Sequence, residues 1–390
     1  MPPRVVIVRG HLATPWELRP WEHLTDRFDV AYLLSDSNQF DVSGVRLPAI
    51  RVRTRRGRAP RGRAGEVLTG VVGDRYLDLP RHLEGADIVH AEELSFWFAA
   101  DAARAKRSSG RRFRLVQTVW ETIPFRETYR NRHARRFRRE VLCETDLFLA
   151  GTERARQALL LEGVPPARVE VCSPGIAVER FGAAAAPDPP PQEHIVLSPG
   201  RLVWEKGHQD VMRAVAALRD GVVGEPVPAP RVLIVGRGPE EERLRSYARE
   251  LGLADRLELR AVGYDEMPGV YARASCMVLA SLPWAGAAYH PFDVPRVFWE
   301  EQFGMVLAEA KAAGLDVLAT TSGAIPEVLG DGGTYFAAGD WVGLARALAT
   351  GPLARPPAAR VEYPADEVEH FSTQAAAERL AAAYERLLAR

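Results

Sequence analysis

Short apolar runs that read as buried strands alternate with longer helix-like runs along the first half of this chain. The strand candidates are Val5–Val8, Val30–Leu34, Ile88–Ala91, Arg114–Val119, Asp146–Ala150 and Arg168–Cys172. Helical runs near residues 94–107, 127–143 and 152–163 lie between several of these strands. This alternation predicts an α/β domain that is built on a parallel sheet.

A stretch rich in Ala and Pro, AAAAPDPPPQ at residues 183–192, separates this half from the next and has the composition of a linker. The length of 390 residues is enough for two domains with complete cores. The second half begins with a strand at Ile195–Ser198 and again alternates strands, glycine turns and helices. We therefore expect one domain over residues 1–182 and a second over residues 193–371.

The most informative segment of the second domain runs from Phe298 to Gly314, where a loop leads into a helix. Glu301 lies in the loop, and Glu309 follows after seven intervening residues. A helix that begins near Gly304 has one apolar stripe to bury, which consists of Val306, Ala310 and Ala313. This arrangement places Glu309 in the second helical turn and Glu301 just ahead of the first.

The N-terminus of this expected helix suits a phosphate group. The backbone N–H groups of Phe303, Gly304 and Met305 point out of the helix and carry the positive end of its dipole. Two carboxylates beside such a terminus can accept hydrogen bonds from sugar hydroxyls. The segment therefore suits a sugar nucleotide, although the spacing alone is equally that of an ordinary helix with two solvated acids.

Two cations follow the first strand of the second domain. The strand runs into Gly200-Arg201 and then to Lys206-Gly207, so the cations lie five residues apart around a tight loop. An arginine offers a planar fork of donors and a lysine offers a point charge, and both suit a diphosphate.

The segment EEQFGMVLAEAKAAGLDVLATTSGAIPEVL resembles the donor-site segment of retaining glycosyltransferases of family 4. The shared pattern is two glutamates seven residues apart with Phe-Gly between them, then a strand, then a glycine followed by a glutamate. Here that last piece runs from Gly323 to Glu327, which is one residue longer than in the family. The resemblance covers nearly the whole chain and implies the GT-B fold, with two Rossmann-like domains facing each other across a cleft. It also implies that a C-terminal helix, about residues 372–390, packs back on the first domain.

The resemblance assigns roles in the donor site. It implies that Arg201 and Lys206 neutralise the diphosphate leaving group, that Glu301 lies by the transferred sugar, and that Glu309 faces the ribose. Glu301, Arg201 and Lys206 are the expected catalytic residues. The expected donor-binding residues are Gly10, Arg201, Lys206, Gly236, Tyr264, Glu301, Phe303, Gly304, Met305, Val306 and Glu309.

The first domain is expected to hold the acceptor. Many relatives carry a His-Asp pair where this chain has Trp120 and Glu121, so a catalytic histidine does not carry over. Glu121 is a candidate to bind a hydroxyl group, with a surface or capping acid as the alternative. His90 and Glu92 end the preceding strand, and we expect them to line the same site.

The composition limits the cofactors and the location. No two Asp residues are separated by a single residue, so the Asp-x-Asp metal motif of the other large glycosyltransferase fold is absent, and we expect no required metal or other cofactor. The three cysteines are scattered and form neither a metal-ligand pattern nor a disulfide framework. The first residues enter a strand directly and no apolar run approaches the length of a membrane span, so we expect a cytoplasmic protein.

The formal net charge is zero, but the charges are uneven, because residues 1–182 hold 31 Lys and Arg against 23 Asp and Glu. Two segments, residues 51–63 and 126–139, each contain seven arginines. They suit an anionic acceptor or peripheral contact with the inner face of a membrane, and a solvated surface is the alternative. We see no nucleic-acid recognition module.

These observations favour a retaining, metal-independent glycosyltransferase that moves a sugar from a nucleotide-diphosphate sugar to a hydroxyl of a small-molecule, glycan or lipid-linked acceptor. A nucleotide-sugar 2-epimerase with the same architecture, or a non-catalytic sugar-nucleotide binding protein, stays open as an alternative. The sequence names neither the sugar nor the acceptor. It also leaves open the oligomeric state and the role of His290 and of the aromatic-rich loop at residues 282–299.

Overall fold

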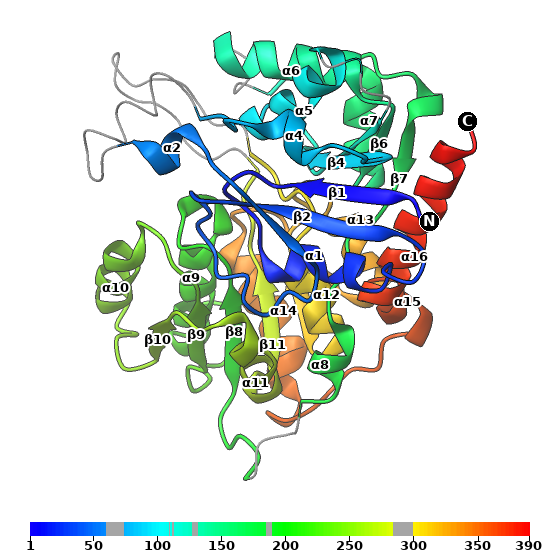
Figure 1. The fold of residues 1–390 in the computed structure, drawn as a ribbon. Helices are drawn as coiled ribbons and strands as arrows, with labels where there is room; N and C mark the ends of the chain where they lie inside the picture. The colour runs from blue at the N-terminus through cyan, green and yellow to red at the C-terminus, as the bar shows by residue number, and fades with distance from the viewer. Residues whose placement is uncertain (60–73, 109, 111–112, 127–131, 185–188, 284–298) are drawn as a thin grey trace. The chain divides into compact units, whose positions relative to one another are not determined.

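The computed structural model describes residues 1–59, 74–108, 110, 113–126, 132–184, 189–283 and 299–390 (Figure 1). The chain forms two compact units, one of residues 1–175 with 373–390 and the other of residues 176–372. Parts of the two arginine-rich segments and most of the aromatic-rich loop, with His290, lie outside the described residues.

The first unit contains a seven-stranded parallel sheet in the order β3-β2-β1-β4-β5-β6-β7. Its strands are β1 (Arg4–Val8), β2 (Asp29–Ser35), β3 (Ala49–Val52), β4 (Ile88–Glu92), β5 (Arg114–Val119), β6 (Leu147–Ala150) and β7 (Val169–Val171). Its helices are α1 (Pro15–Glu22), α2 (Arg55–Arg58), α4 (Leu79–His82), α5 (Trp97–Ser108), α6 (Arg132–Glu144), α7 (Glu153–Leu161) and α16 (Thr373–Leu388), with a 3-10 turn, η2 (Pro166–Arg168).

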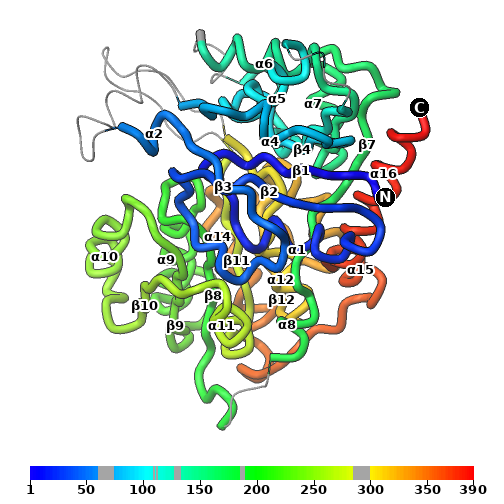
Figure 2. Tube along the Cα trace, in the orientation of Figure 1, coloured from blue at the N-terminus to red at the C-terminus, as the bar shows by residue number. Residues whose placement is uncertain are grey.

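Alternate residues of β1 explain why this strand is apolar throughout. Val6 and Val8 join a core cluster with Phe98 of α5, whereas Val5 and Ile7 join the cluster that contains α1 and α16. Successive side chains of a strand point to opposite faces, so a sheet covered on both faces needs apolar residues at every position. Figure 2 shows the red C-terminal helix α16 near the blue N-terminal segment of the same unit, and α16 packs against α1.

The second unit contains a six-stranded parallel sheet in the order β10-β9-β8-β11-β12-β13. Its strands are β8 (Ile195–Pro199), β9 (Arg231–Val235), β10 (Leu257–Arg260), β11 (Cys276–Leu279), β12 (Asp316–Ala319) and β13 (Thr334–Tyr335). Its helices are α8 (Val178–Gly182), α9 (His208–Arg219), α10 (Glu241–Glu250), α11 (Met267–Arg273), α12 (Met305–Ala312), α13 (Ile325–Leu329), α14 (Trp341–Thr350) and α15 (Ala365–Glu369). The 3-10 turns are η3 (Trp204–Lys206), η4 (Tyr264–Glu266), η5 (Gly330–Gly332) and η6 (Pro352–Ala354).

The units divide at Gly175–Ile176, which is earlier than the boundary at residues 183–192 that the composition suggested. The reason is α8, which packs on α11 and α12 of the second unit. Its Phe181 is buried with its ring 5.4 Å from that of Tyr271 in an edge-on contact. The apolar side of this short helix therefore belongs to the second core, and the Pro-rich stretch comes after it.

Each sheet reverses its strand order at one place, between β1 and β4 in the first unit and between β8 and β11 in the second. The connections after these neighbouring strands leave in opposite directions, and ligands of open α/β sheets bind at the carboxyl ends of the strands at such points. A ligand is therefore expected near the residues that follow β1 and β4 in the first unit, and β8 and β11 in the second.

A buried hydrogen-bond chain joins α16 to the first sheet. Trp21 Nε1 donates to the hydroxyl of Tyr384 (2.9 Å), which contacts His90 Nδ1, and His90 Nε2 lies 2.7 Å from Thr118 Oγ1. An indole can only donate, so the tyrosine hydrogen is left for His90 Nδ1, and the neutral imidazole then donates from Nε2. Burial lowers the pKa of His90 well below its usual value, with Arg9 adding to the effect.

We predict that Tyr384→Phe lowers the free energy of unfolding by about 1–3 kcal/mol, because it leaves the buried groups of Trp21 and His90 without their shared partner. Urea unfolding measures this change. The matched control is Tyr335→Phe, whose hydroxyl donates to the carbonyl of Gly330 from a ring that is 36% exposed. Equal effects of the two variants would contradict the structural role of the buried chain.

Candidate functional site

Two backbone hydrogen bonds hold Glu301 in place. It lies ahead of α12 and is only 7% exposed. Its N–H donates to Ser322 Oγ (3.3 Å), and its carbonyl accepts the N–H of Ala324 (2.8 Å). Gly323 has φ +60°, and a Cβ there would stand 2.0 Å from the Glu301 carbonyl oxygen. Only glycine therefore lets the loop after β12 approach Glu301 so closely.

The Glu301 carboxylate meets side chains from two other segments of the second unit. Lys206 Nζ lies 2.6 Å from Glu301 Oε2, and Ser281 Oγ donates to the same oxygen (2.8 Å). Lys206 ends η3 after β8, and Ser281 follows β11, so the pair lies at the reversal of strand order. The ammonium group also lies 5.0 Å from the ring centre of Trp299.

Two glycines fix the loop that carries the two expected cations. Gly207 has φ +68°, and its Cβ would lie 1.9 Å from the carbonyl oxygen of Ala280. A Cβ on Gly236 would lie 1.8 Å from the carbonyl oxygen of Gly200. Close backbone packing therefore already requires glycine at Gly236, and its expected contact with the donor stays a prediction.

Arg201 differs from Lys206 in its surroundings. Its side chain is 64% exposed, and its guanidinium lies 3.9 Å from the Glu205 carboxylate. An exposed pair at this distance contributes little free energy, so the guanidinium can reorient toward an anion. The loop after β8 therefore carries one largely buried cation, Lys206, and one exposed cation, Arg201.

The helix after Glu301 begins where the sequence suggested, but it buries a different face. Gly304 is the N-cap with φ +79°, and α12 runs from Met305. The sequence predicted that Val306, Ala310 and Ala313 are buried. This prediction is wrong for Val306 and Ala313, which are only partly buried. The buried residues of α12 are Leu307, Ala308, Glu309, Ala310 and Lys311. Phe303 is buried ahead of the helix, edge-on to Phe371.

Glu309 is buried beside a tyrosine. Its Oε2 accepts the hydroxyl of Tyr271 (2.7 Å), and it is 4% exposed. Burial raises the pKa of Glu309 to about 7, against the hydrogen bond from Tyr271 and the charge of Arg180, which lower it. Tyr264 is nearby in the same unit, with its ring 5.5 Å from the guanidinium carbon of Arg180. Arg180 is also paired with Asp265 (2.9 Å), so its charge is balanced within the second unit.

In the first unit a buried arginine follows β1. Arg9 is 3% exposed, and its Nε lies 3.5 Å from Glu92 Oε2. Among the described residues its Nε and Nη1 have no hydrogen-bond partner. Glu17 of α1 is close, and its pKa is raised to about 8 by burial and by Glu92, although Arg9 and Thr14 oppose this. The carboxyl group of Glu17 accepts a hydrogen bond from Thr14 Oγ1 (3.0 Å).

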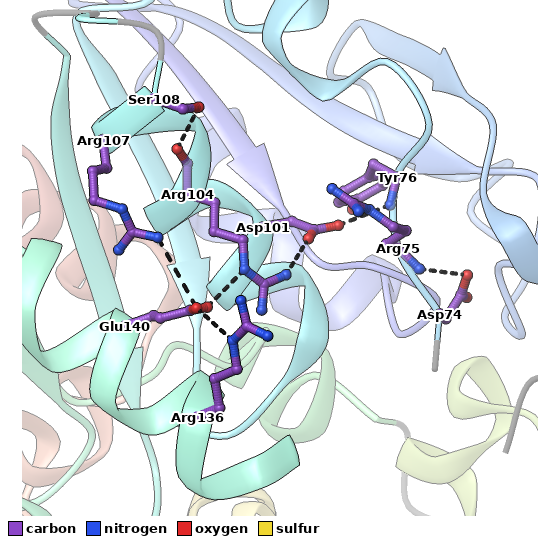
Figure 3. Close-up of polar contacts among 9 residues, drawn as sticks. All are labelled: Asp74, Arg75, Tyr76, Asp101, Arg104, Arg107, Ser108, Arg136 and Glu140. Carbon is purple, nitrogen blue, oxygen red and sulfur yellow. Dashed lines mark hydrogen bonds and ion pairs between the residues drawn. The ribbon is translucent and has the colours of Figure 1, made fainter. Parts of the chain in front are cut away.

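Gly10 comes next and has φ +59°. Its N–H donates to the hydroxyl of Tyr76 (2.9 Å), and a Cβ would stand 2.2 Å from the ring of Phe98. Figure 3 shows how Tyr76 is itself held, because its N–H donates to Asp101 Oδ2 (2.9 Å). Arg104 then bridges Asp101 Oδ1 (2.8 Å) to Glu140 Oε2 (2.7 Å) on α6 (Figure 3). Through Tyr76, this hydrogen-bond network holds the loop at Gly10 in place.

The expected acceptor residues have different surroundings. His90 is fully buried with both ring nitrogens engaged, so it lies beneath the surface and offers no group to an acceptor. Glu92 is buried against Arg9. Trp120 lines a cavity, as described below. The Glu121 carboxylate accepts hydrogen bonds from the N–H of Ile123 and from Arg126.

Sequence reasoning missed Arg9, Glu17 and Glu93. Glu93 has a φ of +62°, which is unusual for a residue other than glycine. Its Oε1 accepts the N–H of Trp120 (2.8 Å). Burial, Glu121 and Glu92 raise the pKa of Glu93 to about 8. The doublet Glu92-Glu93 at a strand end and the arginine before Gly10 were the available signals in the sequence.

A cavity of about 40 Å³ opens beside this cluster within the first unit. Its lining combines the end of β1, helices α1 and α16, and the residues after β5 and β7: Arg9, Trp16, Glu17, Pro20, Trp21, Thr118, Trp120, Cys172, Ser173, Pro174, Gly175, Ala376 and Leu380. This volume is close to that of a single water molecule (about 30 Å³), so the cavity itself does not hold a sugar ring, although its tryptophan and polar side chains can contact a molecule at its opening. The described part of the chain contains no group of three His, Cys, Asp or Glu residues arranged to hold a metal ion.

Two family models match the chain. Residues 22–180 match the model of Glycosyltransferase Family 4, and residues 183–350 match that of Glycosyl transferases group 1. D-inositol 3-phosphate glycosyltransferases of Mycobacterium tuberculosis and Mycobacterium bovis are 30% identical over 201 residues. That match covers 50% of this chain and 38% of each relative, so it spans well under half the length of those proteins.

Solved structures share the fold at low sequence identity. Sucrose-phosphate synthase of Thermosynechococcus elongatus is 18% identical, with a TM-score of 0.72 and 100% of both chains covered. HepE of Anabaena, crystallised with UDP-glucose, is 16% identical with a TM-score of 0.72, over 98% of this chain and 99% of the other. The UDP-GlcNAc 2-epimerase of Methanocaldococcus jannaschii is 12% identical with a TM-score of 0.58, over 98% and 99%.

We predict that Gly323→Ala destabilises the second unit by more than the cost of positive φ alone, because its Cβ collides with the Glu301 carbonyl. The matched control is Gly339→Ala, at φ +80° with no heavy atom within 4 Å of the added Cβ. The control should cost about 1–2 kcal/mol for the left-handed backbone, and Gly323→Ala at least about 1 kcal/mol more. Urea unfolding compares them, and equal costs would show that the close approach to Glu301 is relaxed in solution.

Proposed function

The chain belongs to glycosyltransferase family 4, with the GT-B fold, and we propose that it transfers a sugar from a nucleotide-diphosphate sugar to an acceptor hydroxyl with retention of anomeric configuration. The observation that carries the proposal is the contact of Lys206 with Glu301 at the strand reversal of the second unit. It joins a cation suited to a phosphate and a carboxylate suited to a sugar in one place. The loop that holds Arg201 adds the second cation.

The donor is proposed to lie along the loop after β8 and the start of α12. Lys206 has three N–H donors, and Glu301 takes one of them, so it can also donate to a diphosphate oxygen. The exposed Arg201 can turn to the same group. Gly236, Tyr264, Phe303, Gly304, Met305 and Val306 complete the proposed donor surface. Anabaena HepE, which shares the fold, is crystallised with UDP-glucose, so a uridine diphosphate sugar is the first donor to test.

The chemistry follows from where charge develops. The bond between the anomeric carbon and the diphosphate lengthens, which leaves negative charge on the phosphate and positive charge on the sugar. Arg201 and Lys206 stabilise the first charge, and the fixed carboxylate of Glu301 stabilises the second. The acceptor oxygen then bonds to the anomeric carbon on the face that the diphosphate leaves, its proton passes to the departing diphosphate oxygen, and retention follows.

The acceptor is proposed to bind in the first unit, over the residues at the opening of the small cavity beside Arg9. The buried Nε and Nη1 of Arg9 can donate to an acceptor oxygen, and a buried donor gains most from such a partner. Trp120 and Glu17 supply an aromatic face and a further polar group in the same lining. The mycobacterial relatives are named for D-inositol 3-phosphate, so polyhydroxylated acceptors and their phosphates are the first to test.

The basic face of α6 suits peripheral contact with an anionic membrane. Arg135, Arg136 and Arg139 are exposed on this helix. No helix among the described residues combines the length and the hydropathy that a membrane span needs. We propose a surface contact on the cytoplasmic side, and sedimentation with anionic vesicles at low and high salt tests it, because such binding weakens as salt screens the charges.

Incubation with a panel of nucleotide sugars and acceptors tests the proposed activity. Transfer releases free nucleoside diphosphate only when an acceptor is present, and yields a product with the donor's anomeric configuration. Conversion of the donor to its 2-epimer would instead support the isomerase alternative, whose solved example shares only the fold. Tight nucleotide binding with neither reaction across the panel would support a binding protein.

We predict that Glu301→Gln lowers kcat by about 10²-fold with little change in donor KM, because it removes a fixed charge that acts mainly in the transition state. Glu309→Gln should mainly raise donor KM, because a ribose contact acts in ground and transition state alike. Steady-state kinetics separates the two effects. Similar behaviour of both variants, or a full kcat in Glu301→Gln, would show that the assigned roles are wrong.

Donor affinity should also depend on pH through Glu309. Its raised pKa of about 7 means that it ionises as the pH rises through that value. An ionised carboxylate accepts hydrogen bonds from ribose hydroxyls better than a neutral acid, so donor KM should fall between about pH 6 and pH 8. In Glu309→Gln this part of the pH dependence should vanish. Its survival in the variant would assign the titration to another group.

We predict that turnover survives excess EDTA, because Arg201, Lys206 and the N-terminus of α12 can together take the phosphate charge. The measurement is the initial rate after dialysis against chelator, with and without added Mg²⁺ or Mn²⁺. Loss of activity that either metal restores would contradict the proposed division of charge.

A further inference from the structure

The second unit has a larger cavity that none of the proposed donor residues lines. It has a volume of about 330 Å³ and lies between η3, α9 and α10. The aromatic and polar side chains of its lining include Trp204, Gln209, Arg213, Glu240, Arg243 and Tyr247. Its volume lies in the range of small-molecule sites.

The wall of this cavity presents an indole ring to solvent. Trp204 is 50% exposed, although it lies in a short 3-10 turn between ordered segments. The turn is firmly held, because the carbonyl of Trp204 accepts the N–H of Gly207 (3.1 Å) and Gln209 Nε2 (3.3 Å). A fixed backbone that leaves a large aromatic face exposed has a surface ready for stacking.

The charges in the lining are balanced by pairs. Arg213 donates from Nη1 to Asp210 (2.7 Å) and from Nε to the hydroxyl of Tyr247 (2.6 Å). Arg243 Nη1 donates to Glu240 Oε1 (3.0 Å). An anionic ligand would have to compete with the carboxylates that already hold these arginines. The lining therefore offers hydrogen-bond donors and acceptors of both kinds without an excess of one charge.

We propose that this cavity binds a neutral saccharide, with one face of a sugar ring stacked on Trp204 and its hydroxyls bonded to the paired polar side chains. Carboxylate, amide and guanidinium groups can serve hydroxyls as both acceptors and donors. The site does not depend on the proposed transfer reaction. The sugar comes either from a free saccharide or from a distal unit of a longer glycan, which present the same chemistry.

Ligand-observed NMR on the full chain tests the site. The probes are glucose, galactose, mannose, N-acetylglucosamine, maltose and lactose, with glucose 6-phosphate as a charged comparison. Trp204→Ala removes the stacking surface and should weaken binding of the best saccharide by about tenfold or more. Glu240→Gln, which keeps the shape and removes one acceptor charge, should also weaken it.

The matched control is Phe40→Ala, which removes an aromatic side chain of similar exposure, 48%, from the first unit. It should leave saccharide binding unchanged, and equal thermal unfolding midpoints would show that the variants are folded. Unchanged binding in Trp204→Ala, or absence of saccharide binding to the native chain, would overturn the proposal. Much tighter binding of glucose 6-phosphate that depends on Trp204 would overturn it too, because the site would then select an anion.

A series of glycans of increasing length separates the two sources. Affinity that rises with length and falls in Trp204→Ala supports a distal unit of a glycan, and affinity that is set by one ring supports a free saccharide. Binding of uridine, guanosine and adenosine diphosphates is measured on the same samples. Absence of binding of all three to the native chain would count against the proposed transfer reaction and leave the saccharide site standing.

Discussion

The contact between Lys206 and Glu301 is the interaction on which the second unit's site depends. Both side chains are largely buried, with 13% and 9% of their surface exposed. A buried charge is costly without a partner, so loss of either one destabilises the other more than a surface pair would. The pair also fixes where each charge lies before a ligand arrives. Four segments must therefore fold around it: the loop after β8, the end of β11, the loop after β12 and the start of α12.

The two units carry their polar clusters at the same position in the sheet topology but build them from different side chains. Each places its polar cluster at the reversal of strand order, and each relies on a glycine with positive φ, Gly10 or Gly207, to bring a loop close. The second unit combines its cations with a carboxylate, which suits a phosphate and a sugar together. The first unit places one buried arginine, Arg9, beside the carboxyl groups of Glu92 and Glu17, which suits hydroxyl groups. The division of labour between donor and acceptor in our proposal follows from this difference.

The sequence predicted what depends on local pattern. It located most strands and the helix start at Gly304, because periodicity and glycine placement encode them, whereas the roles that the resemblance implies for Glu301 and Glu309 stay predictions. It misjudged the buried face of α12, because Glu309 and Lys311 are buried by partners distant in sequence, Tyr271 and Glu367. For the same reason it missed Arg9, whose burial depends on contacts that form only in the folded sheet. The early division of the units likewise depends on the packing of α8, which no local composition reveals.

The most direct test of the central claim is calorimetric titration of the full chain with uridine, guanosine and adenosine diphosphates, for the native protein and for Lys206→Ala and Arg201→Ala. Each variant loses one charge-assisted contact to the diphosphate, worth about 1.5–3 kcal/mol. The account predicts that the native chain binds one of these nucleotides and that each variant binds it at least about tenfold more weakly. Affinity that is unchanged in both variants would contradict it, because the diphosphate would then lie away from the loop that joins Lys206 to Glu301.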